Sequence, residues 1–109
     1  MVSIGLLIRL YARPGQGAAV AEFLEGAVPI VDQEPWTTAF FAMRMGPSEF
    51  GIFNAFPDEA SRQAHISGHA AQALFAQGEA LFSQPPSVEP VDIISTKLPS
   101  GAGEFQPVS

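Results

Sequence analysis

The chain contains two histidines, His65 and His69, which lie four residues apart. Histidine is the usual proton-transfer side chain near neutral pH, so we expect His65 to act as a base or polar anchor in a pocket. The alternative is a histidine packed against the core, with one ring nitrogen bonded to the backbone. The spacing of the pair also occurs in metal sites. However, Gly68 interrupts the helix between the two histidines and the chain has no cysteine, so we expect no metal.

Three further polar or aromatic residues are candidates because of where they stand in the sequence. Arg44, within an apolar strand, could stabilise an oxyanion or pair with Glu49 across a hairpin. Asn54, within the next apolar strand, could orient a substrate oxygen or satisfy a bulge. Trp36 could line a pocket mouth or form a lid over the core or over a dimer interface. The predicted catalytic residues are therefore His65, Arg44 and Asn54, and the predicted pocket wall consists of Trp36, Phe53 and His69.

The composition restricts the class of protein. The 109 residues fit one domain, and only 15% of them are charged, against about 25% in typical soluble domains. Five Lys and Arg against eleven Asp and Glu give a net charge of −6, which argues against nucleic acid and anionic membranes as partners. The absence of cysteine excludes disulfides and thiolate nucleophiles. The apolar run Ile4–Leu10 is too short to span a bilayer and no secretory pattern precedes it, so we expect a cytoplasmic protein.

The periodicity of apolar residues predicts a β-α-β-β-α(α)-β order, which is the ferredoxin-like plan of an α+β fold. We expect Pro29 to kink or end the first helix near Val28. Right-handed crossovers would place the first and third strands in the middle of a four-stranded antiparallel sheet with helices on one face. Residues 1–98 would form the domain and residues 99–109 a flexible tail. The expected strands are Ser3–Ala12, Thr37–Met45, Phe50–Phe56 and Val88–Leu98, and the expected helices are Gly17–Val31, Glu59–Ile66 and His69–Phe82.

Both faces of the predicted sheet carry large apolar side chains. In the first strand Leu6 and Ile8 alternate with Leu7, and in the second Phe40 alternates with Phe41. Helices cover only one face in this plan, so the other face would expose a large apolar patch in a monomer. We therefore expect a homodimer that packs sheet against sheet. The alternative is a monomer whose tail folds over the open face.

From about Val2 to Leu98 the chain resembles the antibiotic biosynthesis monooxygenase domain family of the dimeric α+β barrel superfamily. The residues that carry the resemblance are Glu34-Pro35-Trp36-Thr37, Gly46-Pro47-Ser48-Glu49-Phe50, FPDEASRQAHISGHAAQAL and the closing VDIISTKLP.

The resemblance implies a small homodimer that oxidises a small aromatic hydroxy or quinol-type compound with molecular oxygen and without a cofactor. His65 stands where relatives often carry a histidine. Two alternatives remain: a protein of this fold that binds a small hydrophobic molecule without turnover, and a structural dimer. Haem degradation is disfavoured, because the first strand lacks the Asn and the helix lacks the Trp that haem-degrading relatives use.

Overall fold

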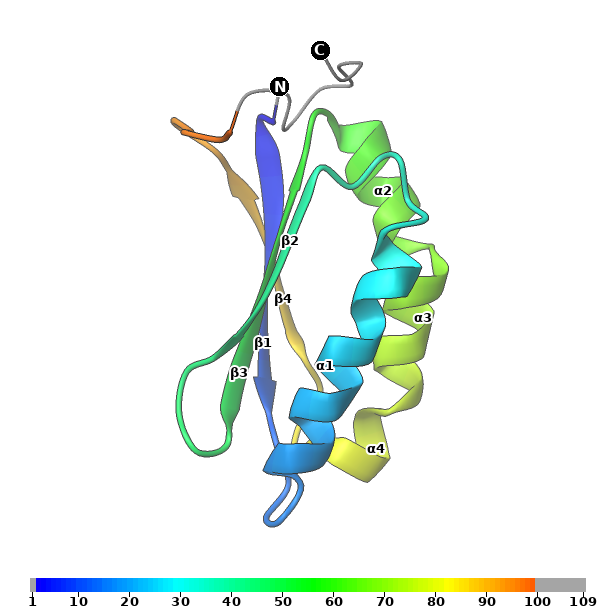
Figure 1. Ribbon diagram of the computed structural model, residues 1–109, viewed down its shortest axis with the longest axis vertical. Coiled ribbons are helices and arrows are strands. Elements are labelled where there is room, and N and C mark those ends of the chain that lie inside the picture. Colours follow the sequence, from blue (N-terminus) through cyan, green and yellow to red (C-terminus); the bar gives the residue numbers. More distant parts are fainter. Residues whose placement is uncertain (1, 100–109) are drawn as a thin grey trace.

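The expected element order is confirmed in a computed structural model, which describes residues 2–99. Four antiparallel strands form one sheet in the order β2-β3-β1-β4, so the first and third strands are central as expected. All helices lie on one face of this sheet (Figure 1). Apart from Pro99, the expected tail lies outside the described residues. The elements are β1 (Ile4–Tyr11), α1 (Gly17–Val31), β2 (Ala39–Arg44), β3 (Glu49–Phe56), α2 (Glu59–Ile66), α3 (His69–Ala76), α4 (Gly78–Leu81) and β4 (Ser87–Asp92).

The two central strands pair without interruption from Ile4↔Phe56 to Tyr11↔Glu49. Asn54 pairs with Leu6 on one side and with Phe40 on the other, so it lies in a regular ladder and does not satisfy a bulge. Because side chains alternate across a strand, this register places Asn54 on the same face of the sheet as those two residues.

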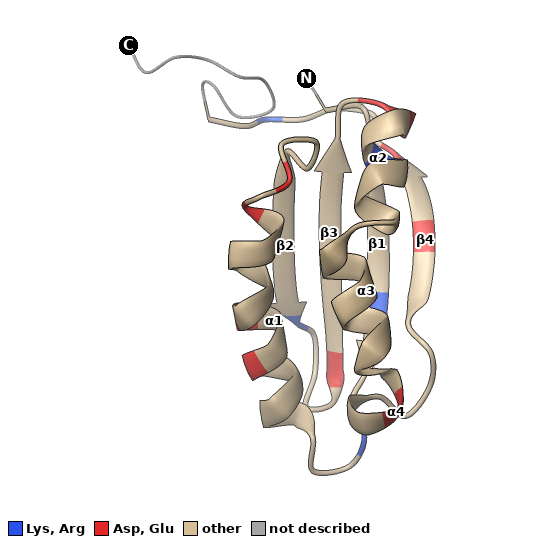
Figure 2. Ribbon diagram, turned by 90° about the vertical axis from the view of Figure 1, so that its right-hand side faces the viewer, with Lys and Arg blue, Asp and Glu red and all other residues tan. Residues whose placement is uncertain are grey.

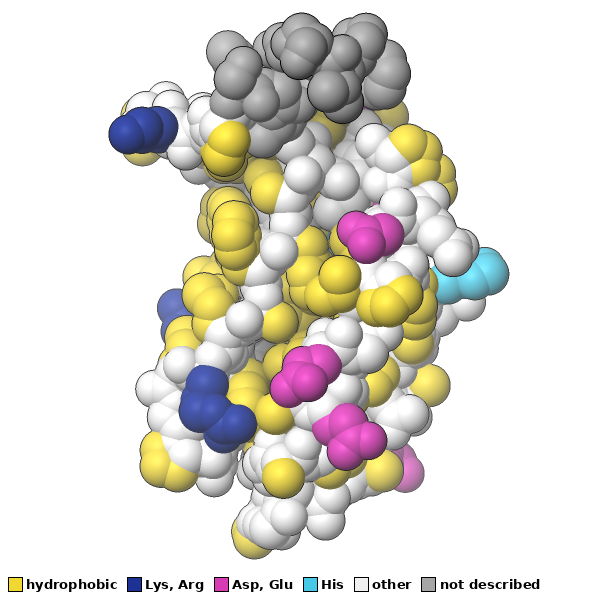
Figure 3. Space-filling view, in the orientation of Figure 1, with side chains coloured by type: hydrophobic (Ala, Val, Ile, Leu, Met, Phe, Trp, Pro, Cys, Tyr) yellow, Lys and Arg dark blue, Asp and Glu magenta, His cyan; other side chains and the backbone are white. Residues whose placement is uncertain are grey.

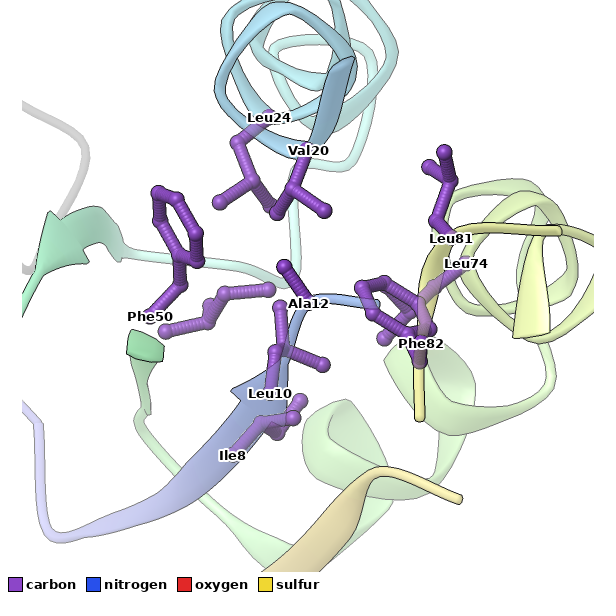
Figure 4. Packing of buried hydrophobic residues seen from close by; sticks show 10 residues of the cluster. Ile8, Leu10, Ala12, Val20, Leu24, Phe50, Leu74, Leu81 and Phe82 are labelled. Carbon is purple, nitrogen blue, oxygen red and sulfur yellow. The ribbon is translucent and has the colours of Figure 1, made fainter. Parts of the chain in front are cut away.

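The helix-facing side of the sheet forms the core. Leu10 and Phe50 from the strands pack with Val20 of α1 and with Phe82, and all four side chains are buried. Figure 4 shows these side chains pointing toward one another from strands and helices on opposite sides of the core. Each such side chain contributes about 1.5–3 kcal/mol of transfer free energy when it is fully buried. This packing fixes α1 and the α3–α4 segment over the sheet.

Of the two effects expected from Pro29, a kink or an end near Val28, the end is not observed, and α1 has the expected bounds. α1 continues to Val31, and the amide of Asp32 still donates to the carbonyl of Val28 at 2.8 Å. Proline removes the hydrogen bond to the residue four positions earlier, here Glu25. Both Glu25 and Pro29 are exposed, so water can satisfy the released carbonyl, and the buried Val31 holds the last turn on the core.

The ends of the other elements lie within two residues of expectation, with two larger differences. The helix predicted for residues 69–82 is divided at Gln77, whose amide donates to Leu74 three residues back. The last strand ends at Asp92 rather than at residue 98. Its partner strand β1 begins at Ile4, which pairs with Asp92, so β1 has no earlier residue with which β4 could pair. Beyond the strand, Ile94 is 98% exposed.

The other face of the sheet is bare of helices in Figure 1. Phe53 and Met45 lie on this open face, where they cover Gly5 and Gly51, which have no side chain of their own. Phe41 and Met43 of β2 are 54% and 37% exposed. The sequence-based division of the strands into two apolar faces is therefore confirmed.

No helix within residues 2–99 has the length and hydropathy needed to cross a membrane.

Candidate functional site

A cavity of about 50 Å³ lies between the helix-facing side of the sheet and helices α1, α2 and α3. Its wall is apolar except for two polar side chains, Asn54 of β3 and His65 of α2. Both residues were candidates on sequence grounds, and the fold brings them together although they belong to different elements. In the fold α2 follows β3 directly, so neighbouring elements of the chain supply both groups to the wall of one cavity.

His65 is 4% exposed and forms a buried pair with Glu34, which is 6% exposed. The distance from His65 Nδ1 to Glu34 Oε1 is 2.6 Å. The Thr37 hydroxyl donates to the same carboxylate oxygen at 2.7 Å. A buried carboxylate is stable only where charged or polar partners replace its water, and these two groups do so. The ring of His65 also packs against Phe56, with a centroid distance of 5.3 Å.

This geometry assigns the histidine proton. A carboxylate can only accept, and Glu34 Oε1 already accepts from the Thr37 hydroxyl, so we place the ring proton of His65 on Nδ1. Within residues 2–99 the hydrogen bonds of the ring all involve Nδ1. In the neutral ring Nε2 is then the nitrogen without a proton, and this tautomer can accept a proton from a ligand.

Glu34 is held in place by the local backbone at the exit of α1. Its amide donates to the Val31 carbonyl at 2.8 Å, and its own carbonyl accepts from the Thr37 amide at 3.1 Å. Its second carboxylate oxygen, Oε2, lies against Gly68, where a Cβ atom would stand only 3.0 Å away. Gly68 is the N-cap of α3, and the partial positive charge of a helix N-terminus favours a carboxylate there.

A second hollow, of about 200 Å³, lies on the other side of Glu34. Glu34, Thr37 and the exposed Asp32 contribute polar groups to its wall. The Glu34–His65 pair therefore stands between a polar hollow and the apolar cavity. A proton accepted by His65 from the cavity side would have a polar route outward along this pair.

Asn54 is fully buried, at 0% exposure, and among residues 2–99 neither its Nδ2 nor its Oδ1 has a hydrogen-bond partner. Buried side-chain amides are nearly always bonded, so an amide with both functions free needs an explanation. Here both free functions belong to a residue in the wall of the same cavity that His65 lines.

The other predicted site residues lie elsewhere. Arg44 is exposed, and its guanidinium stacks over the Phe50 ring at 4.9 Å, in an open groove along α1 and β2. Within the described residues it forms no ion pair with Glu49. Phe53 is on the open face of the sheet, and His69 is an exposed residue at the start of α3. Trp36 is outside the cavity wall, with a buried and unpartnered Nε1.

Sequence reasoning missed Glu34 as a site residue and named it only within the stretch Glu34-Pro35-Trp36-Thr37 that carries the family resemblance. It precedes His65 by 31 residues and belongs to a loop, so no helix or strand spacing links the two. The available signal was an acidic residue between the last apolar turn of a helix and a proline.

Among residues 2–99, no cluster of three or more His, Cys, Asp or Glu side chains is arranged to hold a metal ion.

Comparison with solved structures finds close matches over nearly the whole chain. A protein of unknown function from Nitrosomonas europaea is 50% identical, with a TM-score of 0.90, and the match covers 93% of this chain and 98% of that one. An antibiotic biosynthesis monooxygenase matches with a TM-score of 0.71 at 19% identity, covering 84% of this chain and 99% of that one. A protein from Mycobacterium tuberculosis matches with a TM-score of 0.75 at 15% identity, covering 86% and 97%. No protein-family model and no curated protein matches the chain.

Proposed function

Because the chain belongs to the same family as the Nitrosomonas europaea protein and has the antibiotic biosynthesis monooxygenase fold, we propose that it oxidises a small aromatic hydroxy compound with molecular oxygen. The observation that supports this most strongly is the buried Glu34–His65 pair beside an apolar cavity. A histidine with one nitrogen fixed by a carboxylate and the other unprotonated is prepared to accept a proton in a site that excludes water.

The proposed reaction begins with proton transfer. Nε2 of His65 accepts the hydroxyl proton of the substrate, and Glu34 stabilises the imidazolium that forms, as a carboxylate does for the histidine of a catalytic triad. Nδ2 of Asn54 donates to the substrate oxygen as negative charge develops on it. The resulting anion is electron-rich enough to pass an electron to oxygen.

The overall reaction balances without a further reductant. A hydroxyarene and one O₂ give a quinone and one water: one oxygen atom joins a ring carbon, and the second leaves with the hydrogens of the broken C–H and O–H bonds. The substrate supplies all four electrons. The family resemblance likewise implies a reaction that needs no metal or organic cofactor.

Oxygen uptake across a panel of phenols and quinols tests the proposal. We expect His65→Gln to lower turnover by about 10²–10⁴-fold, the usual contribution of a general base. The matched control is His69→Gln, which changes an exposed histidine outside the cavity wall and should retain activity. Full activity in the His65 variant would show that His65 is not the general base.

A second candidate function is binding of a small hydrophobic molecule without turnover. It is favoured by the wall of the cavity, which is apolar except for Asn54 and His65. The cavity volume is about 50 Å³, against about 150 Å³ for an engineered cavity that holds benzene. A ligand with a ring must therefore displace side chains on entry. Tight binding of a hydroxyarene together with no oxygen uptake would favour this second function.

A further inference from the structure

We propose that the ligand of this cavity is a neutral planar molecule that presents a hydrogen-bond donor beside an acceptor on one edge, namely a vicinal dihydroxyarene. The inference rests on the proposed function for the identity of the site, and it adds the substrate class. It is carried by Asn54, whose two amide functions are both buried and both without a partner.

A primary carboxamide offers an acceptor and a donor side by side in one plane. A ligand satisfies both only if it offers the reverse pair at the same spacing, with a hydroxyl for Oδ1 and an oxygen lone pair for Nδ2. A simple phenol has one hydroxyl proton. If it gives that proton to His65, its oxygen can only accept from Nδ2, and Oδ1 stays buried and unpaired, which costs affinity. The cross-strand neighbours of Asn54, Leu6 and Phe40, are apolar and cannot supply the missing bonds.

The charge of the wall indicates a neutral ligand. Within the described residues no Lys or Arg lines the cavity, and Glu34 lies directly behind His65. A carboxylate ligand would enter an apolar site next to a buried acidic residue, without a fixed cation to offset its desolvation. A neutral hydroxyl compound can enter and then lose its proton to His65.

Room for a ring is present next to the cavity. An adjoining hollow of about 170 Å³ lies between α1 and α3, and it shares Phe23, Ala27 and Ala70 with the cavity wall. Figure 2 shows these two helices as separate columns in front of the sheet. Phe23 is the one bulky side chain among the three shared residues, so its rotation would join the two spaces and admit an aromatic ring with its polar edge toward Asn54.

An ordered water is the competing explanation of the free amide, since a cavity of this size can hold one. Calorimetric titration under nitrogen separates the two explanations, because turnover is then prevented. The probes are catechol, phenol, 1,2-dimethoxybenzene and benzoate. We expect catechol to bind the full-length protein about tenfold more tightly than phenol or 1,2-dimethoxybenzene, a difference typical of one additional buried hydrogen bond, and benzoate to bind least.

In Asn54→Leu, which keeps the number of side-chain heavy atoms and removes both hydrogen-bonding functions, catechol and phenol should bind equally. The control Gln72→Leu makes the same chemical change at an exposed position of α3 and should keep the catechol preference. Equal binding of catechol and phenol to the unmodified protein would overturn the proposal, as would a preference that persists in Asn54→Leu. Failure of every probe to bind, with a water on both amide functions in a crystal structure, would also overturn it.

These outcomes are distinguishable from failure of the proposed function. A catechol preference that depends on Asn54, combined with no oxygen uptake in air, would support the ligand class and contradict only the oxygenase activity. The unmodified protein reports the preference by itself, so the proposal stays testable even if the Asn54 variant fails to fold.

Discussion

At the scale of single residues, the position of the ring proton on His65 depends on Glu34. Replacing Glu34 with Gln keeps the shape of the side chain but removes the charge and introduces an amide donor beside Nδ1. The ring proton would then shift to Nε2, which is the wrong tautomer for a base. We expect Glu34→Gln to lower the oxygen-uptake rate by about 10²–10⁴-fold, while the circular-dichroism melting curve remains cooperative. Glu25→Gln, an exposed change on α1, should have no effect on the rate; unchanged uptake in the Glu34 variant would leave the pair a purely structural role.

Gly68 gives a second test at the residue scale, based on sterics. A Cβ atom there would meet Glu34 Oε2 at 3.0 Å and the Ala64 carbonyl oxygen at 3.1 Å. The backbone at Gly68 has φ −86°, so the substitution introduces no conformational strain of its own. We expect Gly68→Ala to lower the free energy of unfolding by about 1–3 kcal/mol through overpacking.

The matched control is the same substitution in open space. Gly26 of α1 is exposed and has no atom within 4 Å of an added Cβ, so Gly26→Ala should raise the free energy of unfolding by about 0.5–1 kcal/mol through helix propensity. Urea denaturation of both variants measures the contrast. A Gly68 variant as stable as the wild type would mean that the Glu34 side chain can move away from the added methyl group, and that the position of Glu34 against α3 is not fixed.

The sequence revealed two residues of the site and missed a third for a physical reason. His65 stands out because histidine is the usual proton-transfer side chain near neutral pH. Asn54 stands out because it is polar within an otherwise apolar strand, and a register argument places it on the helix-facing side of the sheet. Glu34 does not stand out, because acidic residues are common in loops. Its burial is decided by the backbone turn at the end of α1 and by the position of α2, which are tertiary facts.

At the scale of elements, α2 is fixed by its N-terminal cap. Asp58 accepts a hydrogen bond from the Ser61 amide at 2.8 Å, and this bond lowers the pKa of the Asp58 carboxyl below its ordinary value of 3.8. The stabilisation from a group with a lowered folded-state pKa is fully present above the unfolded value and is lost as the pH falls through the folded value. We therefore expect Asp58→Ala to lower the urea midpoint at about pH 6 and to have a much smaller effect at about pH 3.

The cap prediction has a control on another helix. Glu22→Ala removes an exposed carboxylate from the middle of α1, which caps nothing, and should leave the midpoint nearly unchanged at both pH values. An equal loss at both pH values for Asp58→Ala would show that the charge of the carboxylate contributes nothing. Because α2 carries His65, weaker capping should also loosen the His65–Glu34 contact.

Element boundaries were predictable where the local sequence decides them. Asp58 and the Gly68 break define α2, and its observed bounds match the expectation. The end of β4 was not predictable, because Ile93 and Ile94 have strand-forming side chains and the strand ends only where β1 stops offering a partner. The continuation of α1 past Pro29 likewise depends on the burial of Val31, a tertiary contact that overrides local propensity.

At the scale of the whole molecule, the open sheet face is the feature that a single chain leaves unexplained. Its apolar residues gather on β2 and β3, with Phe41 54% and Met43 37% exposed, whereas the Arg9–Glu89 ion pair lies toward the β4 edge. A stable interface needs a total buried area of about 1,200–2,000 Å² with an apolar centre and a polar rim. We propose that a second copy of the chain covers this face, with the β2–β3 side at the centre of the interface.

The dimer is tested by placing a charge at its proposed centre. Met43→Glu would bury an unpaired carboxylate between two sheets, or expose it harmlessly in a monomer, so we expect the mass measured by light scattering to fall from two chains to one. Val28→Glu changes a residue of similar exposure, 44%, on the helix side, and should remain dimeric. The Met43 side chain lies on the face of β2 opposite to the cavity, so ligand binding by the resulting monomer reports whether the site is complete within one chain. A wild-type mass of one chain would contradict the dimer, and the open face would then need another partner.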